Sequence, residues 1–68
     1  MVYEELTFEE HLRFMAKIKG VAKEHIDSEI EVMLDKTKCQ GEREKLVKDL
    51  SGGNKRKLSL AMALIGGS

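Results

Sequence analysis

The stretch TFEEHLRFMAKIKG, residues 7–20, carries the clearest structural signal in the sequence. Thr7 and Glu10 have the spacing of a capping box, in which the threonine hydroxyl accepts a hydrogen bond from the Glu10 amide and the Glu10 carboxylate accepts one from the Thr7 amide. Apolar residues then recur at helical spacing, and Gly20 provides a left-handed stop. They are Phe8, Leu12, Met15 and Ala16, with Phe14 and Ile18 to one side. The pattern predicts a helix over about 8–19.

Two further segments have helical periodicity. Residues 23–38 carry acids early and lysines late, as the helix dipole favours, and another helix follows the turn at 50–53. The apolar stripe of the first of these segments is Ile26, Ile30, Met33, Leu34 and Thr37. The stripe of the second is Leu58, Ala61, Met62 and Ile65, and we expect Leu60 and Leu64 to widen its buried face. Residues 42–49 are long enough for only a short helical turn, and no strand pattern competes. We therefore expect an all-α structure of about three to four helices.

The composition limits the size and class of the protein. The chain has 68 residues, with 12 Lys and Arg against 12 Asp and Glu, and no proline. A chain this short buries only about 60% of the surface that its unfolded form exposes, so it forms one small unit at most. Zero formal charge removes the electrostatic attraction to nucleic acid or anionic membrane that a basic protein has. Cys39 is the only cysteine, so no internal disulfide forms, and a single thiol fits a reducing compartment.

The sequence has no targeting or membrane-spanning pattern. Its first residues lack the basic region and the apolar region of a signal peptide. No apolar run approaches the roughly 18 residues that a membrane span requires. We therefore expect the chain itself to be soluble.

The turn LSGGN, residues 50–54, is the one place where local rules conflict. Glycine inside a helix costs about 1 kcal/mol relative to alanine, and three cations follow at the helix end where the dipole disfavours them. These cations are Lys55, Arg56 and Lys57. Anion binding would compensate, because glycines allow close approach, the free amides of a first helical turn point outward, and Ser51 can cap the helix or donate its hydroxyl. Such a turn is more often only a connector and a helix cap, so by itself it leaves both interpretations open.

Separate stretches of the chain resemble one family of proteins. Residues 50–67, LSGGNKRKLSLAMALIGG, resemble the signature segment of ATP-binding cassette nucleotide-binding domains, in the form carried by the A-subfamily lipid transporters. Residues 6–14, LTFEEHLRF, and 19–21, KGV, resemble the helical subdomain of the same subfamily at the expected distance before the signature. Residues 27–49 match mainly in helical character. The resemblance therefore covers most of the chain.

The resemblance implies a particular place in a larger fold. Residues 1–68 would be the helical subdomain of an α/β P-loop NTPase domain, with the signature motif at 50–54 and the signature helix at 53–65. By the family pattern the Walker B strand would start just after Ser68, and the glutamine loop would lie just before Met1. The resemblance thus implies a fragment that ends on both sides where essential parts of the domain begin.

The resemblance also implies a nucleotide-binding role for the turn. Two cassettes of this family sandwich ATP, so Ser51, Gly52 and Gly53 would face the γ-phosphate of a nucleotide held by the opposite cassette. Asn54 completes this set of nucleotide-binding residues and stands where glutamine is commonest across the wider family. Lys57 stands where many members have arginine, which keeps the charge but not the planar fork.

The implied activity depends on more than this sequence. ATP would be bound together with Mg²⁺ held by other parts of the domain, because this sequence contains no Walker A or Walker B motif. Alone the chain should not hydrolyse ATP, and we assign it no catalytic and no metal-binding residue. The implied partners are the opposite nucleotide-binding domain and the transmembrane domains of the transporter. The implied place is the cytoplasmic side of a membrane, where ATP hydrolysis would drive transport, by analogy of lipid.

Other functional groups have ordinary explanations. Glu9 and Glu10 fit a helix cap, since adjacent helical side chains do not face one another as an acid–base pair must. His11 and His25 lack the spacing of metal ligands and are expected at the surface or its boundary. Cys39 has no basic cluster nearby, which argues against a catalytic thiol.

Two further classes of function stay open. Residues 55–57, after the Gly-Gly turn, could begin a recognition helix for nucleic acid, but the zero net charge opposes it and we expect no nucleic-acid partner. The chain could also be a stand-alone helical interaction module whose exposed apolar stripe meets another protein. Binding that ignores ATP would distinguish this module from a cassette segment.

Overall fold

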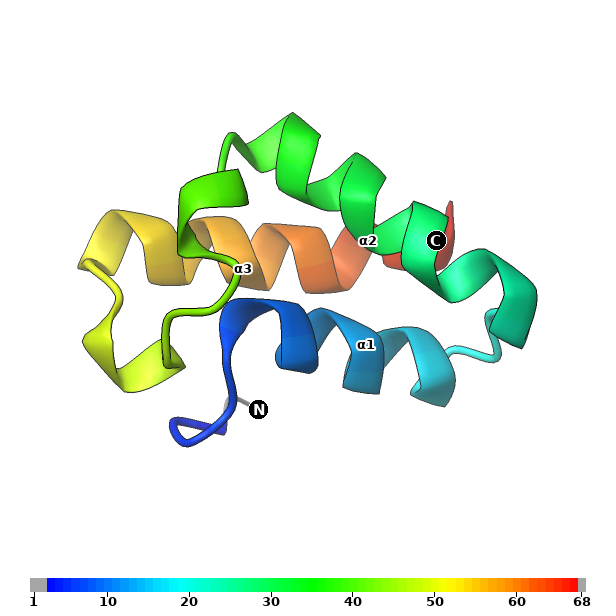
Figure 1. The fold of residues 1–68 in the computed structure, drawn as a ribbon, viewed down its shortest axis with the longest axis horizontal. Helices are drawn as coiled ribbons and strands as arrows, with labels where there is room; N and C mark the ends of the chain where they lie inside the picture. Colours follow the sequence, from blue (N-terminus) through cyan, green and yellow to red (C-terminus); the bar gives the residue numbers. More distant parts are fainter. Residues whose placement is uncertain (1–2, 68) are drawn as a thin grey trace.

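The computed structural model describes residues 3–67 and has an all-α fold (Figure 1). Its helices are α1 (Phe8–Ile18), α2 (Lys23–Thr37) and α3 (Gly52–Leu64). Short 3₁₀ turns lie at Gln40–Glu42, Val47–Asp49 and Ile65–Gly67. Within residues 3–67 the backbone forms no strand and one isolated bridge, between Thr7 and Leu46. The expected all-α class is confirmed.

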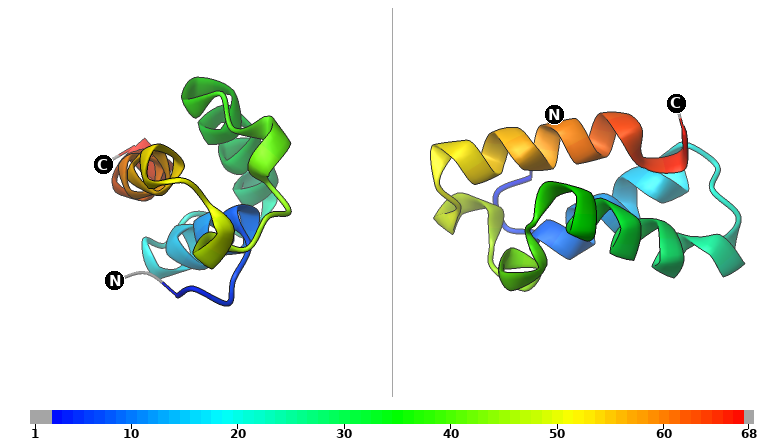
Figure 2. Two further views of the ribbon diagram at one scale, coloured as in Figure 1. Left: turned by 90° about the vertical axis from the view of Figure 1, so that its left-hand side faces the viewer. Right: turned by 90° about the horizontal axis from the view of Figure 1, so that it is seen from above.

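The three helices form a small bundle. Figure 1 shows α1 and α3 running in the same direction and α2 running back the other way. In the end-on view of Figure 2 the three helices occupy the corners of a triangle, and each pair of helices is in contact. The core therefore lies along the axis between them, and the starts of α1 and α3 lie at the same end of the bundle.

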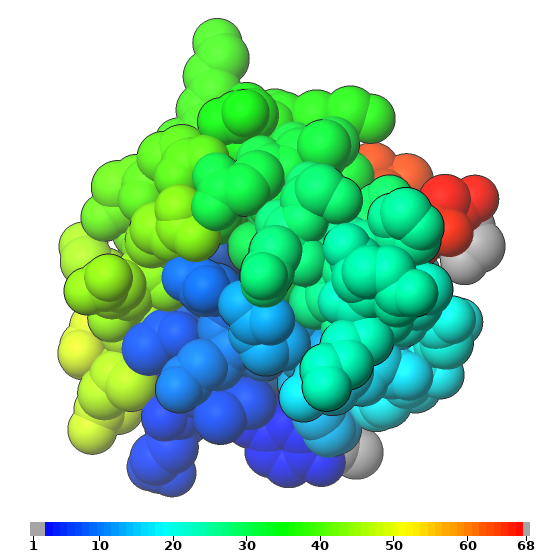
Figure 3. Space-filling model, turned by 45° about the vertical axis from the view of Figure 1, so that its right-hand side comes forward, coloured from blue at the N-terminus to red at the C-terminus, as the bar shows by residue number. Residues whose placement is uncertain are grey.

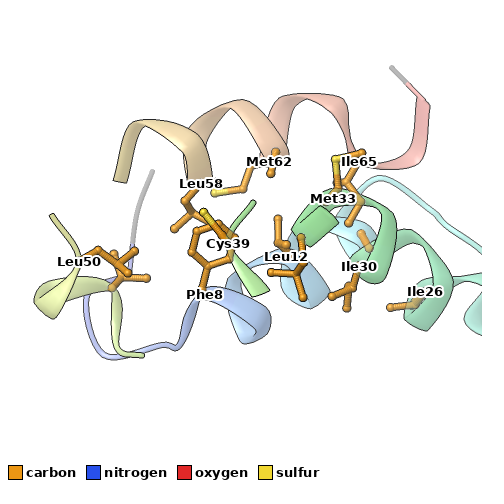
Figure 4. Packing of buried hydrophobic residues seen from close by; sticks show 14 residues of the cluster. Phe8, Leu12, Ile26, Ile30, Met33, Cys39, Leu50, Leu58, Met62 and Ile65 are labelled. Carbon is orange, nitrogen blue, oxygen red and sulfur yellow. The ribbon is translucent and has the colours of Figure 1, made fainter. Parts of the chain in front are cut away.

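The core is one cluster of apolar side chains from all three helices and from the segments between them (Figure 4). Its buried members are Phe8, Leu12, Ala16, Ile26, Ile30, Met33, Leu34, Cys39, Val47, Leu50, Leu58, Ala61, Met62 and Ile65. The stripe expected after residue 53 and four of the five residues expected on 23–38 are among them, and the fifth, Thr37, is buried as a polar residue, so these predictions are confirmed. Periodicity alone identified these positions because the side chains three and four residues apart on a helix share a face.

The expected widening of the α3 face is wrong. Leu60 and Leu64 are 55% and 46% exposed. They lie about 200° and 240° around the helix from Leu58, which is buried, so they point away from the bundle axis. The outer side of α3 therefore carries two large apolar side chains.

His11 is also placed differently from the expectation, because it is completely buried. It lies three residues after Phe8, on the helical face that packs into the core. Its Nε2 accepts a hydrogen bond from the Tyr3 amide at 2.7 Å, and the Tyr3 ring stacks on the imidazole with centroids 5.9 Å apart. Its buried Nδ1 has no hydrogen-bond partner among the residues described. Burial lowers the pKa of His11, since the charged form is the one that loses solvation.

The capping box predicted at the start of α1 is confirmed. The Glu10 amide donates to Thr7 Oγ1 at 3.1 Å, and the Thr7 amide donates to Glu10 Oε1 at 2.9 Å. The His11 amide donates to the Thr7 carbonyl at 2.9 Å, which is the first bond of the helix. At the other end α1 stops at Ile18, and Gly20 has the left-handed φ of +81° that the sequence predicts.

The two remaining amides at the start of α1 are satisfied by a distant part of the chain. The Phe8 amide donates to the carbonyl of Lys45 at 3.1 Å, and the Glu9 amide donates to that of Arg43 at 3.0 Å. A helix start leaves four amides without helical acceptors unless other groups supply them. The start of α1 is therefore closed by the segment that follows α2.

The end of α2 has a feature that the sequence did not suggest. Lys38 adopts a left-handed conformation, with φ of 59°, although it is not glycine. Its amide donates to the Asp35 carbonyl at 3.2 Å, and the Cys39 amide donates to the Leu34 carbonyl at 2.9 Å. These bonds satisfy the last carbonyls of the helix and direct Cys39 back into the core.

Residues 3–6, which we call the N-terminal strap, precede α1 and hydrogen-bond to residues 47–48, which lie shortly before α3. The Leu6 carbonyl accepts from the Val47 amide at 2.8 Å, and the Glu4 carbonyl accepts from the Lys48 amide at 3.2 Å. The strap therefore holds the segment that leads into α3.

Polar contacts also join the other ends of α1 and α3. Lys19 Nζ donates to the carbonyls of Ala63 at 2.7 Å and Ile65 at 3.1 Å. The Gly66 amide donates to the Glu29 carboxylate of α2 at 3.3 Å. The C-terminal end of α3 is thus held by both neighbouring helices.

An ion-pair cluster joins α1, α2 and the segment that follows α2. Figure 3 shows a face of the molecule on which α1 and α2 lie side by side. Arg43 donates to Glu31 at 2.7 Å, to Glu9 at 3.0 Å and to Gln40 Oε1 at 3.0 Å. Its hydrogen bond to Glu31, and that from Gln40, lower the pKa of the Glu31 carboxyl. The same pairing raises the pKa of the Arg43 guanidinium. The cluster fixes the segment that closes the start of α1.

Candidate functional site

The turn before α3 is organised by Ser51, which is the N-cap residue of that helix. Its Oγ accepts a hydrogen bond from the Asn54 amide at 3.1 Å, and its carbonyl accepts from the Lys55 amide at 2.9 Å. The cap uses a lone pair of the hydroxyl oxygen, so the hydroxyl proton stays available as a donor. Ser51 is exposed and can therefore cap the helix and donate outward at once.

Besides the amide of Ser51 itself, this cap leaves open the amides of Gly52 and Gly53. Among residues 3–67 neither amide has a hydrogen-bond acceptor, and both glycines are exposed. They are the first two residues of α3, where helical N–H groups point out along the axis and the dipole is positive. The turn thus presents two backbone donors and one hydroxyl donor in the direction in which the helix points.

The chain itself gives no steric reason for glycine at these two positions. Neither residue has a positive φ, and a Cβ at Gly52 would meet no atom within 4 Å. A Cβ at Gly53 would meet only Ser51 Oγ, at 4.0 Å. Alanine would fit both positions and would favour the helix, so the glycines keep clear a surface on which no other part of residues 3–67 lies.

Three cations surround the turn. Lys55 pairs with Glu4 of the strap at 3.8 Å. Arg56 and Lys57 are exposed and make no ion pair within residues 3–67. The first turn of α3 contains no acid. Within α3 itself, the helix dipole and these cations therefore favour an anion at the turn.

Asn54 differs from its neighbours because its side chain turns inward. It is half-buried, and its Oδ1 lies 3.9 Å from Cys39 Sγ. Cys39 is completely buried and follows the left-handed cap of α2. Sequence reasoning treated Cys39 only as an unreactive thiol and missed this contact, because nothing in a sequence relates two residues fifteen positions apart in different elements.

The structure provides no other candidate centre. Within residues 3–67 no three His, Cys, Asp or Glu side chains gather so as to hold a metal ion, and no pocket is found. No helix in that part of the chain has the length and apolarity needed to cross a membrane. The donors of the turn lie on an open surface, where all four residues named by the sequence, Ser51 to Asn54, are adjacent.

The whole sequence is similar to proteins of one family. No protein-family model matches it. It is 44% identical over 68 residues to ATP-binding cassette sub-family A member 2 of Rattus norvegicus and of Homo sapiens. It is 41% identical over 66 residues to the retinal-specific phospholipid-transporting ATPase ABCA4 of Homo sapiens. It is also 41% identical over 68 residues to the phospholipid-transporting ATPase ABCA3 of Mus musculus.

These matches cover nearly all of the chain and little of each relative. They include 97% of the chain for the human ABCA4 protein and 100% for the others, while the chain spans only 3–4% of the relatives' length. The similarity extends through residues 27–49, where the sequence pattern alone indicated only helical character. Over its whole length, the chain therefore belongs to the A subfamily of ATP-binding cassette proteins.

Proposed function

We propose that this chain is the signature segment of an ATP-binding cassette transporter, and that its turn contacts the γ-phosphate of ATP held by an opposite nucleotide-binding domain. Ser51, Gly52, Gly53 and Asn54 form the contact surface. Closure of the two domains on that phosphate couples ATP binding and hydrolysis to transport. Two relatives are named as phospholipid-transporting ATPases, so the proposed cargo is a lipid.

One observation carries this proposal: the open amides of Gly52 and Gly53 lie under a surface that the glycines keep free of side chains. At the start of α1 the two equivalent amides donate to the chain's own carbonyls. At the start of α3 the acceptor has to come from outside the described residues. A terminal phosphate has oxygens enough to accept from both amides and from the Ser51 hydroxyl.

The chain's own groups would act by binding and orientation. The two glycine amides and the Ser51 hydroxyl would donate to phosphate oxygens, and the helix dipole with Arg56 and Lys57 would stabilise the negative charge. These donors are fixed by the cap before the nucleotide arrives, so little reorganisation accompanies binding. ATP would bring with it Mg²⁺ held by other parts of the domain, and the transmembrane domains would be the second partner.

A helical interaction module is the second candidate, and the exposed Leu60 and Leu64 on the outer side of α3 favour it. The two functions can be distinguished by whether partner binding depends on ATP. Partner binding that is the same with and without ATP, in a complete protein that contains this sequence, would support the module.

The direct test places a negative charge on the contact surface. In a complete A-subfamily ATPase that carries this sequence in place of its own matched segment, Gly52→Asp should lower ATP turnover by about 10²-fold or more, because a carboxylate would oppose the phosphate. Gly41→Asp is the matched control, since Gly41 is also exposed and a Cβ there meets no atom within 4 Å. It should leave turnover unchanged. Unchanged turnover in Gly52→Asp would contradict the proposal.

A further inference from the structure

The contact between Asn54 and Cys39 fixes which end of the Asn54 amide faces inward. The carboxamide carries an acceptor oxygen and a donor NH₂ group on the same carbon. Its Oδ1 lies 3.9 Å from the buried Cys39 Sγ. Its Nδ2 has no hydrogen-bond partner within residues 3–67. The oxygen is therefore directed into the molecule and the NH₂ group is left for another acceptor.

The chemistry of the thiol accounts for this orientation. A thiol has one donor proton, and its sulfur is only a weak acceptor. Cys39 Sγ also lies 3.5 Å from the Thr37 carbonyl, so its single proton is shared between a nearer acceptor, the Thr37 oxygen, and a farther one, Asn54 Oδ1. The opposite orientation would turn the NH₂ group of Asn54 toward a sulfur that accepts poorly. The buried thiol thus prefers the amide oxygen.

Cys39 is itself held firmly. Its amide donates to the Leu34 carbonyl at 2.9 Å, directly after the left-handed Lys38. Its side chain is completely buried, and Figure 4 shows it next to Phe8 and Leu58 of the same cluster. The end of α2 therefore sets the position of the thiol that Asn54 meets.

We infer that Cys39 is a positioning residue: it orients the Asn54 carboxamide so that the NH₂ group joins the amides of Gly52 and Gly53 as a donor to the bound anion. This inference rests on the proposed function and adds a specific donor to it. Asn54 is the group that touches the anion, and Cys39 acts only through Asn54. A negatively charged ligand suits an outward NH₂ group, whereas an outward carbonyl oxygen would repel it.

The test uses the 68-residue chain, labelled with ¹⁵N and titrated with inorganic tripolyphosphate at constant ionic strength. The backbone signals of Gly52 and Gly53 and the side-chain NH₂ signals of Asn54 should move together. Asn54→Ala should weaken binding about tenfold, since it removes a hydrogen bond to a charged group. Cys39→Ala should weaken binding at least about twofold, because half or more of the Asn54 amides would then face the wrong way. Cys39→Ser keeps a donor proton and should retain the affinity.

The outcomes separate this inference from the proposed function. Circular dichroism and the dispersed spectrum of each variant establish that it is folded, and comparison of Cys39→Ala with Cys39→Ser removes effects of the cavity alone. If the glycine amides move but the Asn54 NH₂ signals do not, or if Cys39→Ala binds as the wild type does, the orienting role is wrong and the proposed function stands. If the glycine amides do not move at all, the turn holds no anion in this chain and the inference is wrong, whereas the proposed function is decided separately by ATP turnover of Gly52→Asp in the complete ATPase.

Discussion

The starts of α1 and α3 are built on one plan. Each begins with a hydroxyl residue whose side chain accepts from the amide three residues later and whose carbonyl accepts from the amide four residues later. At α1 the other two amides donate to the carbonyls of Arg43 and Lys45, and the first turn carries two glutamates. At α3 the other two amides, those of Gly52 and Gly53, have no acceptor within residues 3–67, and the first turn carries no acid.

The two helix starts differ in where their amides find acceptors and in which residue occupies the first helical position. A structural start draws its missing acceptors from elsewhere in the chain and fills its first position with a core side chain, as Phe8 does. The start of α3 keeps the cap but has an exposed glycine in that position. Substitutions at matched positions can therefore test whether the two starts have different purposes.

The largest effect is expected at the first helical position. Phe8→Ala should lower the free energy of unfolding by about 3–5 kcal/mol, because it empties a fully buried site. The matched change Gly52→Ala should raise it by about 0.5–1 kcal/mol, since alanine fits without contact and restricts the unfolded chain. Urea denaturation followed by circular dichroism measures both. A loss of stability in Gly52→Ala would mean that the glycine serves the fold.

A smaller effect is expected at the caps. Thr7→Ala and Ser51→Ala should each lower the free energy of unfolding by about 1 kcal/mol, because each removes the acceptor of a first-turn amide. Thr7→Ala should cost more, since Ser51 is exposed and water can replace its oxygen. Thr7→Ser and Ser51→Thr keep the acceptor and serve as controls. If Ser51→Ala costs nothing, the two starts do not share one plan.

The smallest effect is expected from pH, and it should act on the start of α1. The pKa of His11 is lowered by burial, so the unfolded chain binds a proton more readily than the folded one. Stability should be complete above the unfolded value near about 6.5 and decline as the pH falls from there toward the lowered folded value. Urea denaturation at a series of pH values measures this decline.

Two variants assign the decline to His11. His11→Gln keeps an acceptor for the Tyr3 amide and should flatten the profile across this range. His25→Ala, at an exposed histidine, should leave the profile as it is in the wild type. A decline that persists in His11→Gln would place the titrating group elsewhere.

Much of the fold could be predicted because it depends on short-range spacing. The Thr7–Glu10 box, the left-handed Gly20 and the buried stripe of α2 each involve residues within a few turns of one another. The position of His11 three residues after Phe8 places it toward the core, but its contact with Tyr3 of the strap could not be predicted, since that contact depends on how residues 3–6 fold over α1. The outward position of Leu60 follows from sequence spacing, which places it about 200° around the helix from Leu58, and the expectation was wrong because it gave apolarity more weight than this angle.

The sequence predicted where the site lies, but it did not predict which contacts the residues of the site make. The Ser-Gly-Gly pattern locates the turn, and the Ser51 cap follows from local rules. The contrast with α1 depends on the carbonyls of Arg43 and Lys45, which meet amides more than thirty positions away in the chain. The Cys39 contact likewise depends on how α2 ends. Periodicity and motifs contain no information about contacts between residues that are far apart in the sequence.

The parallel course of α1 and α3 has an electrostatic consequence for the whole molecule. Their peptide dipoles add and the antiparallel α2 offsets only part of the sum, so the pole at which α1 and α3 start is electropositive, while the opposite pole receives the ammonium group of Lys19. At the electropositive pole the glutamates of α1 offset that helix's share, and the share of α3 is left without such compensation. An approaching polyanion would therefore be steered to the start of α3 rather than to the start of α1 before any hydrogen bond forms.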